Sequence, residues 1–230
     1  MIVGGLMNLT LLDYPEKVAC TVFTKGCNFR CPFCHNATLV NDHDCQDLTV
    51  YEVLEFLKKR KPVLEGVCLT GGEPLIQNDV EEFLTTAKKI GYNVKLDTNG
   101  SFPDRLIALV ENGLIDYCAM DVKNSKSRYA ETIGTNVDIA AIEKSVAYLL
   151  SQDKIPFEFR TTVTANFHDE KSIEQLAEWI AGAPKYYLQK FVDSGDLIDG
   201  TVTGASDEQM HRYLEIAKKY VPAAELRGME

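Results

Sequence analysis

Apolar and polar positions follow a pattern that repeats six times along the chain. Each repeat opens with a short apolar segment bounded by turn residues, which is typical of a strand. It continues with a segment whose apolar residues recur at the three- and four-residue spacing of one helix face. The expected strands lie at 17–24, 66–70, 93–98, 116–123, 156–163 and 185–191.

Two of the expected helices carry a start signal in their first turn. Thr49 is followed three residues later by Glu52, which is the pattern of a capping box. Asn78 and Glu81 repeat that spacing before the next helix. Four later helices are expected at about 103–112, 138–151, 170–181 and 206–220.

The order of these units predicts the fold class. Strict alternation of strand and helix indicates a parallel α/β sheet covered by helices, either doubly wound or closed into a barrel. Eight units make a closed barrel of about 250 residues. Six units in 230 residues therefore favour a partial (β/α)6 TIM-like barrel with one open side. In both arrangements ligands bind at the C-terminal ends of the strands.

Composition narrows the class of protein mainly by exclusion. With 230 residues, of which 45% are hydrophobic and 25% charged, the chain fits one globular domain spanning 1–230. No apolar run approaches the roughly 20 residues of a membrane helix, and the start lacks the pattern of a signal peptide. We therefore expect a soluble, cytoplasmic protein without a membrane partner.

Charge and cysteine usage sharpen that expectation. Lys and Arg number 24 against 34 Asp and Glu, a net charge of −10, and no basic stripe is present. Because phosphate neutralisation supplies most nucleic-acid affinity, we expect no nucleic-acid partner. Seven cysteines, an odd number, in a chain of this size indicate a reducing compartment and thiols used for metal or redox chemistry.

The expected strand ends carry the most distinctive sequences of the chain. These are KGCNFRCPFCHN, GGEP, DTNG and DVK, in the order of the first four strands. The first contains a C-x3-C-x2-C motif formed by Cys27, Cys31 and Cys34. Three thiolates in one loop favour a soft metal, either zinc or an iron–sulfur cluster.

Both metals remain open on ligand count. Structural zinc needs a fourth ligand, which His35, His43 or Cys45 could supply, and the protein would then be a zinc-stabilised binding module. A cubane cluster normally takes four cysteines, so three would leave one iron open to a substrate.

The remaining cysteines have a simpler interpretation. Cys20, Cys68 and Cys118 each lie within an apolar strand, where a thiol behaves as a small hydrophobic group. Cys45 lies in the polar segment VNDHDCQD and is expected to be a loop thiol.

CNFRCPFC, with Phe33 as its aromatic residue, resembles the signature of the radical S-adenosylmethionine (SAM) superfamily, and GGEP at 71–74 resembles its second motif. Within that superfamily the chain is most similar to the glycyl-radical-enzyme activases, particularly those of anaerobic ribonucleoside-triphosphate reductase. The similar passages are LLDYPEKVACTVFTKGCNFRCPFCHN, LTGGEPL, DTNG and MDVK, and the resemblance covers essentially the whole chain.

The resemblance implies one 4Fe-4S cluster on Cys27, Cys31 and Cys34, with SAM chelating the fourth iron through its amino and carboxylate groups. Only one cysteine lies between Cys34 and Thr49, so no auxiliary cluster is expected. The implied cofactor-binding residues are Phe33, Cys34, His35, Gly71, Gly72, Glu73, Pro74, Asp97, Asp121, Val122, Lys123 and Arg160.

Several of these residues also have a purely structural interpretation. Asp97 could accept from a ribose hydroxyl, bind a cation or serve the SAM ammonium, but DTNG is equally a turn sequence. Asp121 and Lys123 share one face of a strand and could form a plain ion pair. Lys123 or Arg160 could instead hold the SAM carboxylate, and Gln189 is a further candidate contact.

The activity implied by the resemblance is radical chemistry. The reduced cluster would pass one electron to SAM, and the resulting 5'-deoxyadenosyl radical would take a hydrogen atom from the Cα of a glycine in a partner enzyme. No general acid or base is assigned, and a flavodoxin or ferredoxin would supply the electron. The loop at 192–206 is expected to border the open side of the barrel, where the partner would approach.

A different substrate class remains open within the same superfamily. The 7-carboxy-7-deazaguanine synthases are of similar length and act on a small molecule. The sequence therefore predicts a radical SAM activase, with a small-molecule radical SAM enzyme as the alternative.

Overall fold

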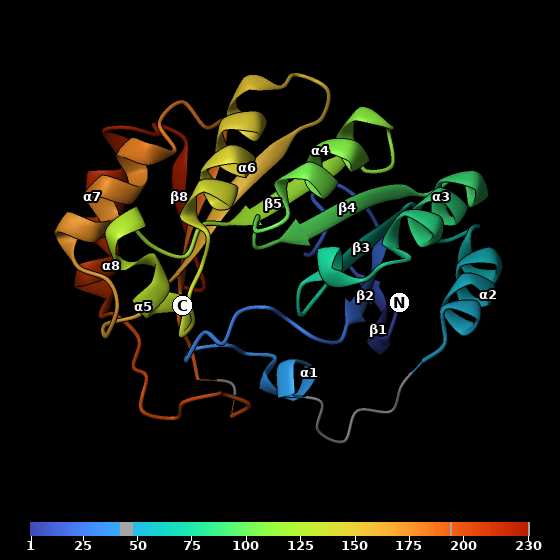
Figure 1. The fold of residues 1–230 in the computed structure, drawn as a ribbon, viewed down its shortest axis with the longest axis horizontal. Helices are drawn as coiled ribbons and strands as arrows, with labels where there is room; N and C mark the ends of the chain where they lie inside the picture. The colour runs from blue at the N-terminus through green and yellow to red at the C-terminus, as the bar shows by residue number, and fades with distance from the viewer. Residues whose placement is uncertain (42–47, 194, 230) are drawn as a thin grey trace.

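The computed structural model describes residues 1–41, 48–193 and 195–229. Its centre is one sheet in which every strand lies beside the next strand of the chain (Figure 1). Strands β2 to β8 are parallel, and β1 pairs with β2 in the antiparallel sense. The strands are β1 (Val3–Thr10), β2 (Ala19–Thr24), β3 (Gly66–Gly71), β4 (Asn93–Thr98), β5 (Tyr117–Asp121), β6 (Phe157–Val163), β7 (Tyr186–Lys190) and β8 (Ala224–Arg227).

The six predicted strands correspond to β2 through β7, and the parallel α/β arrangement is confirmed. Two strands were not predicted. β1 contains adjacent glycines and lacks a clear alternation of apolar and polar residues, and β8 has only four residues. Both form the edges of the sheet, where packing on one side alone gives a weaker sequence pattern.

Most of the helices lie in an arc around the outer face of the sheet, whereas the short α1 (Ala37–Asn41) lies apart from them, below the strands in this view (Figure 1). Their apolar faces pack on the strands and form one continuous core. The helices are α1 (Ala37–Asn41), α2 (Val50–Arg60), α3 (Val80–Ile90), α4 (Pro103–Glu111), α5 (Tyr129–Ile133), α6 (Ile139–Ser151), α7 (Glu170–Trp179) and α8 (Asp207–Lys218), with 3-10 turns η1 (Pro74–Ile76) and η2 (Lys126–Arg128). In the part of the chain that the structure describes, no helix has the length and apolarity needed to span a membrane.

One predicted helix start is confirmed and the other is wrong. Thr49 caps α2, accepting from the Glu52 backbone while the Glu52 carboxylate accepts from the Thr49 N–H at 2.8 Å. α3 instead begins after Asp79, which makes no side-chain cap. The Asp79 carboxylate forms an ion pair with the amino group of Met1, and this contact takes the place of a local cap.

Alternation along the strands gives the sheet a second, polar face. Val94 and Leu96 of β4 pack in the core, so Lys95 and Asp97 point to the opposite, inner side. The buried cysteines divide in the same way. Cys20 and Cys118 belong to the apolar core as predicted, whereas Cys68 lies 3.8 Å from the Lys95 ammonium and is not purely a hydrophobic group.

Candidate functional site

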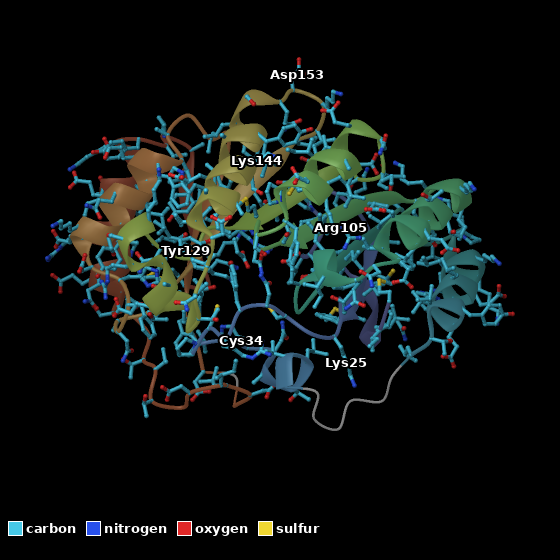
Figure 2. The ribbon with its side chains drawn as sticks, viewed as in Figure 1. Lys25, Cys34, Arg105, Tyr129, Lys144 and Asp153 are labelled. Carbon is cyan, nitrogen blue, oxygen red and sulfur yellow. The ribbon has the colours of Figure 1, made fainter. Side chains whose placement is uncertain are left out.

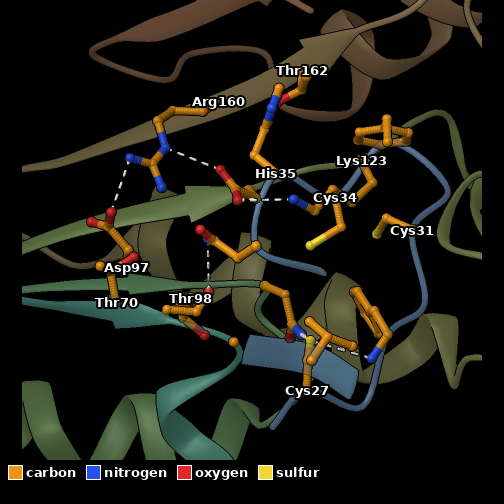
Figure 3. Close-up of a pocket in the computed structure, with 18 of the residues that line it drawn as sticks. Cys27, Cys31, Cys34, His35, Thr70, Asp97, Thr98, Lys123, Arg160 and Thr162 are labelled. Atoms are coloured by element: carbon orange, nitrogen blue, oxygen red, sulfur yellow. Dashed lines mark hydrogen bonds and ion pairs between the residues drawn. The ribbon is translucent and has the colours of Figure 1, made fainter. Parts of the chain in front are cut away.

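A cavity of about 310 Å³ lies where the central strands end, enclosed by the loop that carries the C-x3-C-x2-C motif (Figure 3). We call residues 25–36 the cysteine loop. Figure 2 shows Cys34 of this loop below the sheet, on the side away from Asp153, which lies at the top edge of the molecule. The strand ends of the sheet and the cysteine loop therefore form one site, as the sequence predicted.

The cysteine loop brings its three thiols to the cavity wall. Cys27, Cys31 and Cys34 all line it. Arg30 stabilises the loop by donating from Nη1 to the carbonyl oxygens of Cys27, at 2.6 Å, and Phe29, at 2.8 Å. The Arg30 N–H donates to the Ile133 carbonyl at 2.9 Å, which ties the loop to α5.

Burial keeps these thiols protonated without a metal. It raises the pKa of Cys27 to about 11 and that of Cys31 to about 12, although the nearby Lys123 ammonium opposes both shifts. Since thiolate is the form that binds metal, loading the site must release protons.

The three thiols share the wall of one cavity, as a cluster would require. In the described residues, no group of three His, Cys, Asp or Glu side chains converges closely enough to hold one metal ion. In a cubane each iron takes its own cysteine, so the sulfurs need only surround a common cavity. His35, one candidate zinc ligand, has its ring stacked on Phe191, with 5.3 Å between centroids. His43 and Cys45 lie outside the described residues.

The GGEP turn packs directly against the cysteine loop. The Gly72 N–H donates to the Thr24 carbonyl at 2.8 Å, and a Cβ on Gly72 would lie 1.8 Å from the Gly26 oxygen. Gly71 has φ of +112°, in the region that favours glycine. Both glycines also line the cavity. Glycine is required at these positions because two backbone segments pass so close together that a side chain would not fit between them.

Glu73 is buried and turned away from the cavity. Its carboxylate accepts from the Leu75 N–H at 3.0 Å, the Thr98 hydroxyl at 2.8 Å and the Asn99 N–H at 2.7 Å. Burial raises its pKa to about 7. Glu73 therefore joins the GGEP turn to the end of β4. Pro74 and Val122 are likewise buried outside the cavity lining.

Five charged side chains form a chain across the inner face of the sheet. Arg160 donates to Asp97 at 3.1 Å and to Asp121 at 3.0 Å. Lys95 pairs with Asp97, and Lys123 pairs with Asp121 at 2.9 Å. Three cations thus share two carboxylates, which leaves one positive charge for an anionic ligand group.

The charges in this chain hold each other ionised. Burial alone would raise the pKa of Asp121, but Lys123 and Arg160 outweigh it and hold that pKa well below its usual range. His168 fixes the backbone here: its Nδ1 accepts from the Thr164 N–H at 3.2 Å, so its Nε2 donates to the Lys123 carbonyl at 2.9 Å. Burial lowers the pKa of His168 to about 4, which keeps the ring neutral.

The cavity lining also includes residues that the sequence did not single out: Phe29, Asn36, Val40, Thr70, Thr98, Asn99, Thr162 and Lys190. Thr162 lies two positions after Arg160 on β6, so strand alternation could have identified it. Lys95 is a charged residue within an apolar strand, like Arg160, but it was not named as a candidate site residue. Gln189 lines the cavity as expected.

The loop at 192–206 lies beside the cysteine loop. Asp196 accepts from the Thr38 N–H at 3.2 Å and hydroxyl at 2.9 Å, and the Asp199 N–H donates to the Pro32 carbonyl at 2.9 Å. These contacts place the loop against the cysteine loop and α1. That it borders the open side of the barrel stays a prediction. Residue 194 lies outside the described part of the chain.

A second cavity, of about 550 Å³, adjoins the first. Asp97, Arg160 and Gln189 line both cavities. The rest of its wall comes from the inner face of β4, β6 and β8 and from the β1–β2 loop. In that loop the side chains of Leu11 and Leu12 are 68% and 90% exposed.

Comparison with known proteins agrees with this geometry. A family model described as the Radical SAM superfamily matches residues 21–180. A Methanocaldococcus jannaschii protein, provisionally named a glycyl-radical enzyme activating enzyme, is 32% identical over 235 residues, or 98% of this chain and 95% of that protein. The 7-carboxy-7-deazaguanine synthase of Thermoplasma acidophilum is 31% identical over 147 residues, covering 64% of this chain and 63% of that protein.

Among solved structures, Streptococcus suis SuiB bound to precursor peptide SuiA is similar with a TM-score of 0.73. Its sequence is 15% identical, and the match covers 91% of this chain and 48% of SuiB, so it supports the fold alone. The predicted TIM-like α/β fold is thus confirmed. The chain belongs to the Radical SAM superfamily, whose members use a 4Fe-4S cluster and SAM.

Proposed function

We propose that this radical SAM enzyme is an activase that generates a glycyl radical on a partner enzyme, most specifically an anaerobic ribonucleoside-triphosphate reductase. The observation that carries the proposal is the junction of the two cavities at Asp97, Arg160 and Gln189. In this proposal an extended protein segment would enter through the second cavity, past the exposed Leu11 and Leu12, and approach the cysteine loop. A relative named for glycyl-radical enzyme activation supports the same class.

In this proposal Cys27, Cys31 and Cys34 hold the cluster. When bound, the reduced cluster and SAM supply one-electron cleavage of a carbon–sulfur bond and, from it, a carbon radical that can take a hydrogen atom. The protein itself would bind SAM and orient it. The Lys123 ammonium and the Arg160 guanidinium offer the unmatched positive charge to the SAM carboxylate, and the buried wall excludes water from the reacting atoms.

The remaining expected contacts are those that the resemblance to the superfamily implies, and the cavity lining is compatible with them. Phe33, Cys34 and His35 would lie beside the adenine, and the Gly71–Gly72 backbone would meet the methionine part of SAM. Glu73 and Pro74 would act indirectly, by holding the turn in place. Radical chemistry needs no proton transfer at carbon, so no acid or base is assigned. A flavodoxin or ferredoxin would deliver the electron.

The test is anaerobic turnover with SAM, a reductant and the large subunit of the reductase, followed by electron paramagnetic resonance. We expect a doublet signal on that subunit, lost when its C-terminal-region glycine is changed to alanine. Cys31→Ala should abolish the signal and Cys118→Ala should retain it, because Cys31 lines the cavity and Cys118 belongs to the apolar core. Activation of a different glycyl-radical enzyme would replace the named partner; consumption of SAM by a small molecule alone would overturn the activase proposal.

A small-molecule reaction is the second candidate, favoured by the likeness to a 7-carboxy-7-deazaguanine synthase over 147 residues. The second cavity has polar walls suited to a polar ligand: Glu158 accepts from Arg227 at 3.1 Å and from the Tyr117 hydroxyl at 2.7 Å. This candidate predicts that SAM cleavage accelerates when a heterocyclic carboxylate precursor is added without any protein partner.

A further inference from the structure

The carboxamide of Asn99 lies against the first thiol of the cysteine loop. Asn99 follows β4 directly and is 6% exposed. Its Nδ2 is 4.0 Å from the Cys27 sulfur and donates to the Asn28 Oδ1 at 2.9 Å. It is therefore a buried polar group from the sheet that approaches the sulfur from outside the cysteine loop.

Hydrogen bonds fix which end of this carboxamide faces the sulfur. Its Oδ1 accepts from the Ser101 N–H at 2.9 Å and from the Ser101 hydroxyl at 2.6 Å. The Ser101 hydroxyl could accept as well as donate, but the Ser101 N–H can only donate. Exchanging the oxygen and nitrogen would therefore set the NH2 group against this N–H, a donor-to-donor contact, so the NH2 group is assigned to the side of Cys27.

Hydrogen bonds also fix the backbone at Asn99 and Gly100. The Asn99 N–H donates to the buried Glu73 carboxylate at 2.7 Å, and the Gly100 N–H donates to the Thr98 hydroxyl at 3.2 Å. The Phe29 N–H supplies a second donor to the Cys27 sulfur, at 3.4 Å. Cys27 thus has one donor from its own loop and one from a rigid strand end.

We propose that Asn99 is a positioning residue that raises the reduction potential of the cluster by donating an N–H to the Cys27 thiolate. Hydrogen bonds to cluster sulfurs are one of the determinants of cluster potential, because the more negative reduced state gains more from a donor than the oxidised state does. The inference rests on the proposed ligation of the cluster by Cys27.

Anaerobically reconstituted protein allows a direct measurement by redox titration, with the reduced cluster followed by electron paramagnetic resonance. Asn99→Leu keeps the volume and the dry surroundings but removes the donor, so its midpoint potential should be more negative than that of the unsubstituted protein. Asn99→Asp keeps the contacts from Ser101, removes the donor and adds charge, so its potential should be lower still. Asn93→Ala is the matched control, since Asn93 lies at the other end of β4 and its side chain donates to the Glu65 carbonyl.

The outcomes separate this inference from the proposed function. If the unsubstituted protein binds no cluster, the proposed function fails. If all variants carry the same iron and Asn99→Leu has an unshifted potential, the inference is overturned, and a shift in Asn99→Asp alone would also overturn it because charge would then be the cause. Should Asn99→Leu not take up iron, Asn99→Ala replaces it, and an unshifted potential there is equally decisive.

Discussion

Lys123 is the residue whose charge matters most for ligand binding, because it ends the chain of ion pairs nearest the cysteine loop. We expect Lys123→Ala to weaken SAM binding roughly 10- to 100-fold, since a charge-assisted hydrogen bond contributes about 1.5 to 3 kcal/mol. Anaerobic equilibrium dialysis measures this. Lys126→Ala is the control, because Lys126 pairs with Glu143 near the surface. Unchanged affinity in Lys123→Ala would make Lys123–Asp121 a structural ion pair only.

The titration of Glu73 should make the free energy of unfolding depend on pH. Burial raises the pKa of Glu73 from 4.5 to about 7, so the folded state favours the protonated carboxyl. Its contribution to stability is full below pH 4.5 and is lost as pH rises toward 7. In Glu73→Gln this site no longer titrates.

The free energy of unfolding should therefore change differently in the two proteins. We compare the free energy of unfolding of the unsubstituted protein with that of Glu73→Gln at each pH. The difference, unsubstituted minus variant, should fall by about 2 kcal/mol between pH 5 and pH 8. Urea denaturation of the metal-free proteins at several pH values checks this. A difference that grows with pH would contradict the assignment of a raised pKa to Glu73.

At the residue scale, sequence reasoning found the charged side chains and the Asp121–Lys123 pair, but not the pairs that join different strands. Asp121, Lys123 and Arg160 stood out because buried charges need partners. That Arg160 bridges Asp97 and Asp121 depends on β4, β5 and β6 being neighbours, which spacing along the chain does not give. Asn99 was missed for the same reason, since its role depends on the distant Cys27.

At the scale of elements, the turn after β3 is the most constrained connection of the site. Gly72→Ala should destabilise the fold by roughly 2 kcal/mol or more, because its Cβ would overlap the Gly26 carbonyl and push the cysteine loop away. Gly200→Ala is the control, as nothing lies within 4 Å of a Cβ at that position. Gly72→Ala should unfold at a lower urea concentration and take up less iron than Gly200→Ala. Equal values for the two variants would rule out this role of the close backbone contact.

The elements that the sequence predicted correctly share a clear physical signal. β2 to β7 are apolar and mostly buried, and the helices that cover them have one apolar face. The Thr49 cap was predictable because both of its partners are local. The start of α3 was not, because Asp79 pairs with the amino group of Met1. Strand β8 depends on packing against β7 and has little pattern of its own.

At the scale of the molecule, the two cavities predict how a protein substrate reaches the site. Leu12→Asp should slow radical formation on the partner about tenfold or more, since burying a leucine contributes roughly 1.5 to 3 kcal/mol. SAM cleavage without partner should be unaffected, because Leu12 does not line the cysteine cavity. Val63→Asp is the control, an exposed apolar residue outside both cavities. Equal loss in the two variants, or loss of SAM cleavage itself, would argue against entry past Leu12.

The most direct test of the central claim is transfer of a hydrogen atom from glycine. The partner reductase is prepared with glycine deuterated at Cα and incubated anaerobically with this protein, SAM and a reductant. We predict 5'-deoxyadenosine that carries deuterium in amounts that match the radical formed, and none when the partner's radical-site glycine is replaced by alanine. Unlabelled 5'-deoxyadenosine, formed at the same rate with and without the partner, would contradict the account.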